Sequence, residues 1–240
     1  MELTGCRAVV TGGGGGLGEV VVGALTRQQM HVVVADVDGE AAHRVAAEVG
    51  GTAVTADLSD DGGVDAVIAA VGEDVDVLIN CAGGWSPTGR HFPDAADVVW
   101  DSVLTLNLRS PMRLLQRLRV PLSRSPVGAA VSISSSAGLG SGAYGSPEYA
   151  VAKVGLIRLT TALADWGDRF SVRVACVVPG WIGLPRAVRE VAAMPASARP
   201  MLIPPNHIAN EVLRLVTDER SGGQVVVIDE GEPSRTLTSR

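Results

Sequence analysis

Tyr149 and Lys153 are the two residues of this sequence whose types and spacing most suggest chemistry. Lys153 is the only lysine, the other nineteen of the 20 basic residues are arginines, and Tyr149 is one of 2 tyrosines. Residues four apart lie on the same face of a helix. Arginine is a bulky planar fork, whereas lysine is a compact cation on a flexible stem. We therefore expect the Lys153 ammonium to lie beside the Tyr149 phenol and to donate hydrogen bonds to a ligand.

The helix that carries this pair is expected to begin at Ser146. Serine is a favoured N-cap residue, and Pro147 would occupy the first helical position, where proline is well tolerated. This start places Tyr149 just inside the first turn, and the helix is expected to continue to about Trp166.

A glycine-rich segment near the N-terminus predicts a phosphate-binding loop. An apolar strand at residues 7–10 runs into Thr11 and five consecutive glycines, and a helical stretch follows from Glu19. Glycines in a strand-to-helix turn let the backbone approach a pyrophosphate, and the helix start supplies free N–H groups. A kinase-type P-loop would need a lysine after its last glycine, so Glu19 excludes it. The residues expected to contact a dinucleotide here are Gly12, Gly15, Gly16, Leu17 and Gly18.

Asp36 predicts which dinucleotide binds. It ends the second strand, residues 31–35, and Val37 follows it. A carboxylate at this point accepts hydrogen bonds from the adenosine ribose hydroxyls and repels a 2′-phosphate. No arginine or lysine lies in the glycine loop or directly after Asp36. We therefore expect NAD(H) as the cofactor in preference to NADP(H).

Apolar strands alternate with helical stretches along the whole chain. Strands are expected at residues 7–10, 31–35, 52–56, 75–79, 128–133, 172–178 and 224–228. This order is typical of a parallel sheet covered by helices on both faces and joined by right-handed crossovers. The prediction is one α/β domain over residues 1–240, a Rossmann-like doubly wound fold with about seven strands. Residues 185–203, rich in proline, alanine and methionine, are expected to form an irregular substrate lid.

Composition excludes several classes of function. The net charge of −6 argues against a nucleic-acid partner, and the stripe of Arg109, Arg113 and Arg117 is interpreted as a solvated or subunit-contacting helix face. No apolar run is long enough to span a membrane, and the N-terminus lacks the pattern of a signal peptide, so a cytoplasmic location is expected. The 3 widely spaced cysteines are expected to be free thiols, and no clustered His/Cys pattern suggests a metal site.

Several motifs in order along the chain together resemble the classical short-chain dehydrogenase/reductase family. The residues that carry the resemblance are Thr11-Gly12-x-x-x-Gly16-x-Gly18, Asp57-Leu58, Asn80-Cys81-Ala82-Gly83, Asn107, the serines at 134–136, Tyr149-x-x-x-Lys153 and Pro179-Gly180. The resemblance covers essentially the whole chain. It implies an oxidoreductase that uses a nicotinamide dinucleotide on an alcohol or ketone.

The resemblance assigns roles to four catalytic residues. Tyr149 is expected to be the general acid/base, with Lys153 lowering its pKa and binding the nicotinamide ribose. A serine is expected to polarise the substrate carbonyl. The end of the fifth strand and the glycine that follows it match the family pattern and indicate Ser135. A count of thirteen residues back from Tyr149 gives Ser136 instead. We prefer Ser135. Asn107 is expected to hold a water through its backbone carbonyl, because Pro111 has no N–H to bond that carbonyl and disturbs the helix there.

The resemblance also completes the expected cofactor site. Its further members are Asp57, Leu58, Asn80, Ala82, Gly83, Tyr149, Lys153, Pro179, Gly180 and Ile182. Two positions depart from the family pattern. Cys81 replaces a second asparagine, and Leu184 occupies the place of a threonine that contacts the carboxamide, a contact that backbone groups at Ile182 could replace.

The substrate is expected to be a small, fairly apolar secondary alcohol or ketone. The expected walls of its site are Trp85, His91, residues 139–144, Trp181 and the lid, and no arginine or lysine is evident among them to bind an anion. An NADPH-dependent 3-oxoacyl thioester or polyketide-type ketoreductase is the alternative enzyme, and a non-catalytic dinucleotide-sensing protein is the alternative of another class. The resemblance also implies a homotetramer or homodimer formed through helices at about 96–122 and 149–166.

Overall fold

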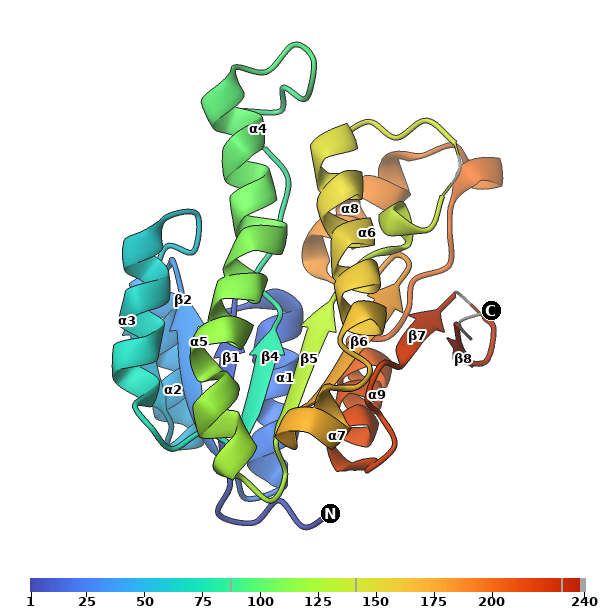
Figure 1. Ribbon diagram of the computed structural model, residues 1–240. Helices are drawn as coiled ribbons and strands as arrows, with labels where there is room; N and C mark the ends of the chain where they lie inside the picture. Colours follow the sequence, from blue (N-terminus) through green and yellow to red (C-terminus); the bar gives the residue numbers. More distant parts are fainter. Residues whose placement is uncertain (87, 141, 230, 238–240) are drawn as a thin grey trace.

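The segments that carry the predicted site residues meet at the carboxyl ends of the strands of a central sheet. The computed structural model describes residues 1–86, 88–140, 142–229 and 231–237, and within them eight strands form one sheet in the order β3-β2-β1-β4-β5-β6-β7-β8 (Figure 1). The strands are β1 Arg7–Thr11, β2 His31–Asp36, β3 Thr52–Thr55, β4 Val77–Asn80, β5 Ala129–Ile133, β6 Arg173–Pro179, β7 Val225–Ile228 and β8 Arg235–Thr236.

Strands β1 to β7 are parallel, as the sequence predicts. The inner strands are short runs of valine, alanine and isoleucine, and every residue of β4, β5, β6 and β7 is buried. Strands that are covered on both faces need continuous apolar runs rather than alternating ones. The expected α/β class and parallel sheet are therefore confirmed.

Helices cover both faces of the sheet. They are α1 Gly16–Arg27, α2 Gly39–Val49, α3 Asp61–Val71, α4 Asp97–Leu104, α5 Ser110–Arg124, α6 Pro147–Ala162, α7 Trp166–Phe170, α8 Pro185–Ala193 and α9 Pro205–Thr217. Buried side chains of α1, α2 and α9 form one core with the sheet, and those of α3 and α5 form a second core on the other face. Figure 1 shows α3, α5 and α6 in front of the strands, with α1 and α9 behind them.

The strand order reverses between β1 and β4, because β1 pairs with β2 on one side and with β4 on the other. In open parallel sheets, ligands bind at such a switch point, beyond the carboxyl ends of the strands. The glycine loop follows β1, and Cys81–Gly84 follow β4. The fold thus brings both segments to the same crevice.

Three parts of the fold differ from the prediction. The sheet has an eighth strand, β8, which pairs antiparallel with β7. It is only two exposed residues long, so no apolar pattern announces it. The helix expected to reach Trp166 ends at Ala162, and Trp166 begins the separate helix α7, whose Trp166 and Phe170 rings pack edge to face 5.4 Å apart.

The segment 185–203 was expected to be irregular, but most of it is helical. Helix α8 occupies Pro185–Ala193, and a 3-10 turn follows at Ala196–Ala198. Pro185 at the first helical position and the Arg186–Glu190 ion pair, 2.7 Å long and one turn apart, are local features that favour a helix here. A parallel bridge between Ile182 and Ile203 joins the two ends of the segment.

The Arg109, Arg113 and Arg117 stripe faces α3. Arg117 pairs with Asp65 at 2.8 Å, and both Arg113 and Arg109 pair with Asp61. Arg113 and Arg117 join α5 to α3, and Arg109, just before α5, pairs with α3 as well; most of these side chains remain exposed to solvent, in agreement with a solvated face. None of the described helices is long and apolar enough to cross a membrane.

Candidate active site

Helix α6 brings Tyr149 and Lys153 to the crevice. Its start at Pro147 follows the predicted Ser146 N-cap, but the Ser146 side chain makes no capping bond. Its hydroxyl instead donates to Oε1 of Glu148 at 2.9 Å. The helix boundary was predicted correctly, whereas the capping interaction was not.

Lys153 is buried behind the crevice, with 3% of its surface exposed. Its ammonium donates to the carbonyl of Ile133 at 3.0 Å and lies 5.4 Å from the centre of the Tyr149 ring. Burial lowers the pKa of Lys153 to about 8, because a charged ammonium is poorly solvated there. At neutral pH, Lys153 is therefore still protonated in most molecules.

Tyr149 lies between two aromatic rings. The Trp85 ring is 5.3 Å away and the Tyr144 ring 6.4 Å away, measured between ring centres. Burial raises the pKa of Tyr149 to about 12, and a hydrogen bond with Ser135 opposes that rise. The expectation of a lowered pKa is therefore wrong, because burial disfavours the phenolate more than Ser135 and the positive charge of Arg186 favour it.

The three candidate serines occupy different environments. Ser134 is buried and donates to the Lys153 carbonyl at 2.7 Å, so it helps to position α6. Ser135 accepts a bond from the Ala137 N–H at 3.2 Å and interacts with Tyr149. Ser136 begins a 3-10 turn and also lines the crevice. Of the three, Ser135 is the one that lowers the pKa of Tyr149.

Asn107 lies within a π-helical turn, Thr105–Arg109, between α4 and α5. The Ser110 N–H bonds to the Thr105 carbonyl five residues back, and Pro111 has no N–H to offer the carbonyl of Asn107. The expected irregularity is therefore present. The Asn107 amide, fully buried, donates to the carbonyls of Gly84 and Val103 at 2.8 Å each and accepts from the Gly84 N–H at 3.1 Å. It fixes the loop after β4 from beneath, while its water-binding role stays a prediction.

A cavity of about 780 Å³ runs from the glycine loop to Tyr149. All the residues predicted to bind the cofactor line it, with the exception of Asn80. Gly12 has φ of +66°, and a Cβ at that position would lie 2.9 Å from the Ala82 Cα, so the two loops meet backbone to backbone. A Cβ on Gly83 would lie 2.7 Å from Oδ1 of Asn107 and 3.0 Å from Nζ of Lys153. The loops can pack this closely because glycine has no side chain at these two positions.

Asp36 and Asp57 reach this cavity from neighbouring strands. Asp36 accepts bonds from the N–H groups of Gly14, at 2.9 Å, and Asp38, at 3.0 Å. Asp57 accepts from the backbone and hydroxyl of Ser59, and these bonds lower its pKa. Both carboxylates are therefore oriented before a ligand arrives.

Asn80 lies beneath the cavity rather than on its wall. It is 3% exposed, and its amide nitrogen donates to the Ser132 hydroxyl at 3.4 Å. Its buried Oδ1 has no partner among the residues that the structure describes. The wall itself is formed by Cys81, whose thiol pKa is raised by burial to about 12, so that the thiol is unreactive.

Arg186 lines this cavity and the one beside it, and it was not predicted from the sequence. Its guanidinium lies 4.0 Å from the centre of the Trp85 ring, and its side chain also pairs with Glu190. No basic residue was expected on these walls from the sequence, whereas the structure places Arg186 on them. Arg186 follows Pro185 at the start of a helix, and recognition of that helix would have placed its side chain beside the crevice.

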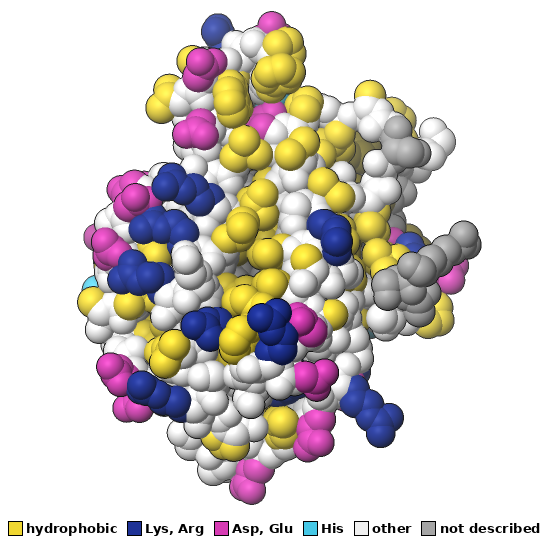
Figure 2. Space-filling model, in the orientation of Figure 1, with side chains coloured by type: hydrophobic (Ala, Val, Ile, Leu, Met, Phe, Trp, Pro, Cys, Tyr) yellow, Lys and Arg dark blue, Asp and Glu magenta, His cyan; other side chains and the backbone are white. Residues whose placement is uncertain are grey.

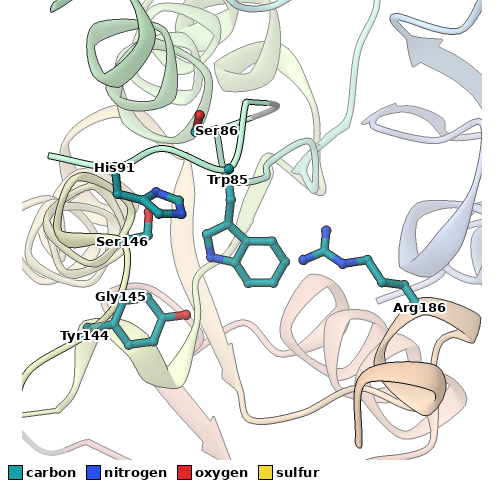
Figure 3. Close-up of a pocket in the computed structure, with 8 residues that line it drawn as sticks. Trp85, Ser86, His91, Tyr144, Gly145, Ser146 and Arg186 are labelled. Atoms are coloured by element: carbon teal, nitrogen blue, oxygen red, sulfur yellow. The ribbon is translucent and has the colours of Figure 1, made fainter. Parts of the chain in front are cut away.

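A second cavity, of about 700 Å³, adjoins the first. Both are lined by Trp85, Tyr144 and Arg186. In Figure 3 the His91 imidazole and the Tyr144 phenol point toward one side of the Trp85 indole, and Arg186 approaches from the other side. Of the walls expected from sequence, Trp85, His91 and Tyr144 line one or both cavities, Trp181 lines the first, and Ser141 lies outside the described residues.

The residues present fit a nicotinamide dinucleotide. The elongated cavity joins a glycine loop at a helix start, a carboxylate at the end of β2 and a Tyr–Lys pair, which are the parts that hold a pyrophosphate, an adenosine ribose and a reactive ring. Within the described part of the chain, no group of three or more His, Cys, Asp or Glu side chains could hold a metal ion.

Comparisons with known proteins agree with this geometry. A family model described as short chain dehydrogenase matches residues 7–195. D-xylose 1-dehydrogenase from Caulobacter vibrioides is 32% identical over 235 residues, which cover 92% of each chain. The structure of 3-ketoacyl-(acyl-carrier-protein) reductase from Brucella melitensis complexed with NADH is similar with a TM-score of 0.80 at 26% identity, covering 95% of this chain and 98% of that one. The Pseudomonas aeruginosa RhlG/NADP active-site complex is similar with a TM-score of 0.83 at 26% identity, covering 96% and 97%. The residues matched by the family model include every predicted site residue, from Gly12 to Ile182.

Proposed function

The chain belongs to the short chain dehydrogenase family, and on that premise we propose that it uses NAD(H) to interconvert a secondary alcohol and a ketone on a small molecule. The family uses NAD(P), and its members are oxidoreductases. The observation that carries the proposal is that Ser135, Tyr149 and Lys153 line the same cavity, with the Lys153 ammonium 5.4 Å from the centre of the Tyr149 ring. The basic and polar groups at the cavity, Arg186 and His91, favour a more polar substrate than the sequence alone suggested.

Two hydroxyl groups act on the same substrate oxygen in this proposal. When bound, the nicotinamide cofactor supplies or accepts a hydride at the reacting carbon. Tyr149 gives its phenolic proton to the carbonyl oxygen during reduction and removes the proton from the alcohol during oxidation. Ser135 donates a hydrogen bond to that oxygen, which stabilises the negative charge that develops on it.

The protonation of Tyr149 makes the two directions differ in their response to pH. With its pKa raised to about 12, the phenol is neutral at ordinary pH and ready to donate in reduction. Oxidation needs the phenolate, so its rate is expected to rise with pH until another step limits turnover. With its pKa lowered to about 8, Lys153 loses its charge as the pH rises through that value, so its support for the phenolate is greatest below about pH 8.

Asp36 supports NAD(H) over NADP(H). Its carboxylate lines the adenosine end of the cavity, where it would repel a 2′-phosphate. Arg44 lies close by and donates to the Gly14 carbonyl at 3.1 Å, but it also pairs with Glu19 at 2.9 Å and Glu48 at 3.2 Å. Two acidic partners hold this guanidinium, so it is not free to attract a phosphate.

Tyr149→Phe tests the proposed function. The phenyl ring keeps the packing with Trp85 and Tyr144 but has no proton to transfer. Turnover should fall by about 10²-fold to 10⁴-fold in both directions, with NADH still raising the melting temperature more than NADPH does. Steady-state kinetics on a panel of secondary alcohols and ketones, combined with thermal shift, measures both effects.

Tyr144→Phe is the matched control, because it removes the other tyrosine hydroxyl of the chain from the same cavity wall. It should leave turnover within a few-fold of wild type. If Tyr149→Phe were as active as Tyr144→Phe, the proposed acid/base role would be wrong. A larger thermal shift with NADPH than with NADH would instead refute the cofactor assignment alone.

A further inference from the structure

Glu148, the residue next to Tyr149, is a buried carboxylate with three hydrogen-bond donors around it. It is 5% exposed. Its Oε1 accepts from Nδ1 of His91 at 2.7 Å and from the Ser146 hydroxyl at 2.9 Å, and its Oε2 accepts from the Phe92 N–H at 3.4 Å. Burial alone would raise the pKa of Glu148, but these hydrogen bonds lower it below its ordinary value. The group is therefore a carboxylate in the folded protein.

The start of a helix explains only part of this arrangement. A carboxylate in the first turn of α6 is stabilised by the free N–H groups and the helix dipole. That effect needs no partner from another segment. Yet Glu148 reaches across to the loop after β4, 57 residues earlier in the chain, and fixes the imidazole of His91 there.

The carboxylate also fixes which His91 nitrogen carries the proton. An ionised carboxylate only accepts hydrogen bonds, so Nδ1 of His91 must be the donor. In the neutral imidazole this leaves Nε2 with a lone pair and no hydrogen. Nε2 of His91 has no hydrogen-bond partner within the described residues.

His91 lines the second cavity together with Trp85, Tyr144 and Arg186. The last three also line the cavity that contains Tyr149, so a small molecule at Tyr149 can extend toward His91. Figure 3 shows the imidazole directed toward the Trp85 indole. His91 thus presents a hydrogen-bond acceptor in the cavity that adjoins the one containing Tyr149.

We propose that His91, oriented by Glu148, is a substrate-binding residue that accepts a hydrogen bond from a second hydroxyl group of the substrate, so that the preferred substrates are diols, hydroxyketones or larger polyols. This inference rests on the proposed function, because it assumes that Tyr149 acts on the first oxygen. Glu148 is a positioning residue, since it acts on the substrate only through His91. Arg186, across the indole, gives the same space a second polar wall.

The test compares cyclohexanol with its 1,2-, 1,3- and 1,4-diols as substrates for oxidation at about pH 8. The three diols place the second hydroxyl at different distances from the reacting carbon, so no single spacing has to be assumed. The wild type should favour at least one diol over cyclohexanol in kcat/KM. His91→Phe should lower the kcat/KM for that diol by about fivefold to tenfold, the worth of one hydrogen bond, and leave cyclohexanol nearly unchanged.

Two further variants separate recognition from folding. His91→Gln keeps a side-chain oxygen that can accept a hydrogen bond and should recover part of the diol preference. His207→Phe changes an exposed histidine on α9 and should have no effect on either substrate. Glu148→Gln should reduce the diol preference and change the ¹⁵N shifts of His91, because an amide no longer fixes the proton on Nδ1.

The outcomes distinguish the two proposals. Turnover that depends on Tyr149 but shows no diol preference, or a preference that survives His91→Phe, overturns the role of His91 alone. A lack of turnover on the whole panel of alcohols and ketones, or turnover that is insensitive to Tyr149→Phe, overturns the proposed function and this inference with it.

Discussion

At the scale of single residues, the hydroxyl that completes the site can be identified by comparing Ser135 with Ser136. Both serines line the cavity, but Ser135 lowers the pKa of Tyr149, whereas Ser136 is not among the groups that shift it. Ser135→Ala should lower kcat by about 10²-fold to 10³-fold, because the developing oxyanion loses a donor. Ser136→Ala is the matched control and should stay within a few-fold of wild type. Equal losses in the two variants, measured by steady-state kinetics, would contradict the assignment of Ser135.

The pKa of Lys153 can be measured directly, because no other lysine side chain contributes a signal. As the only lysine, it should give a single side-chain NMR signal in protein labelled with ¹³C-lysine. In the cofactor-free protein this signal should titrate near pH 8, because burial disfavours the charged form, rather than at the ordinary value of 10.5. Arg158→Lys adds an exposed lysine on the same helix as a reference, and its signal should titrate in the ordinary range. A Lys153 signal that titrates together with the reference would refute the effect of burial.

Much of the site at this scale could be predicted from sequence, because the residues follow one another in motifs. Gly12, Asp36 and Lys153 all line one cavity, as expected. The direction of the Tyr149 pKa could not be predicted, since it depends on how deeply the ring is buried. The His91–Glu148 pair was also missed, because nothing in the local sequence says that residues 57 positions apart will meet.

At the scale of elements, helix α8 is the part of the structure that most changes the view of the substrate site. It lies beyond the ends of the strands, behind α6 in Figure 1, and carries Arg186 onto Trp85. The positive charge of Arg186 lowers the pKa of Tyr149, although burial has the larger and opposite effect. The helix thus contributes to the electrostatics of the acid/base group as well as to the cavity wall.

Arg186→Ala should therefore raise the pKa of Tyr149 further. The pH profile of alcohol oxidation should move to higher pH, and the rate at neutral pH should fall by a few-fold. The shift should shrink at high salt, because the guanidinium is exposed and its charge is screened. Arg189→Ala, on the same helix but not on either cavity wall, should leave the profile unchanged. An unshifted profile for Arg186→Ala would contradict the electrostatic role.

The elements that sequence reasoning found and missed differ in one physical respect. The buried strands carry continuous apolar runs, so β1 to β7 were all expected from the sequence. Helix α8 buries little, with Val191 its only fully buried side chain among the described residues, and β8 buries nothing. Elements held by a few specific contacts leave no strong periodic signal.

At the scale of the whole molecule, one face carries apolar side chains that a single chain leaves uncovered. Met112 and Val120 of α5 and Val151 and Val154 of α6 are each 45–58% exposed. Figure 2 shows hydrophobic side chains gathered along the strip over these two helices, with basic side chains beside it. Exposed apolar patches of this kind often mark contacts between proteins, which agrees with the expected homotetramer or homodimer through these helices.

The double variant Met112→Glu and Val151→Glu should weaken that association. Two carboxylates in an apolar contact would have to be desolvated without partners. Sedimentation velocity should then show a smaller species than the wild type. Val188→Glu, a change of an exposed valine on α8, should leave the assembly intact. A monomeric wild-type protein would refute the expectation outright.

The burial of the only lysine has a practical consequence for labelling. Reagents that acylate primary amines have two targets in this chain, the N-terminus and Nζ of Lys153. Nζ lies behind Tyr149 and Gly83, so the folded protein should react almost only at Met1. Modification of Lys153 would then report each opening of the active site, and a bound dinucleotide should suppress it. Lys153, which we propose to serve catalysis, could therefore act as a probe of local unfolding and of cofactor occupancy.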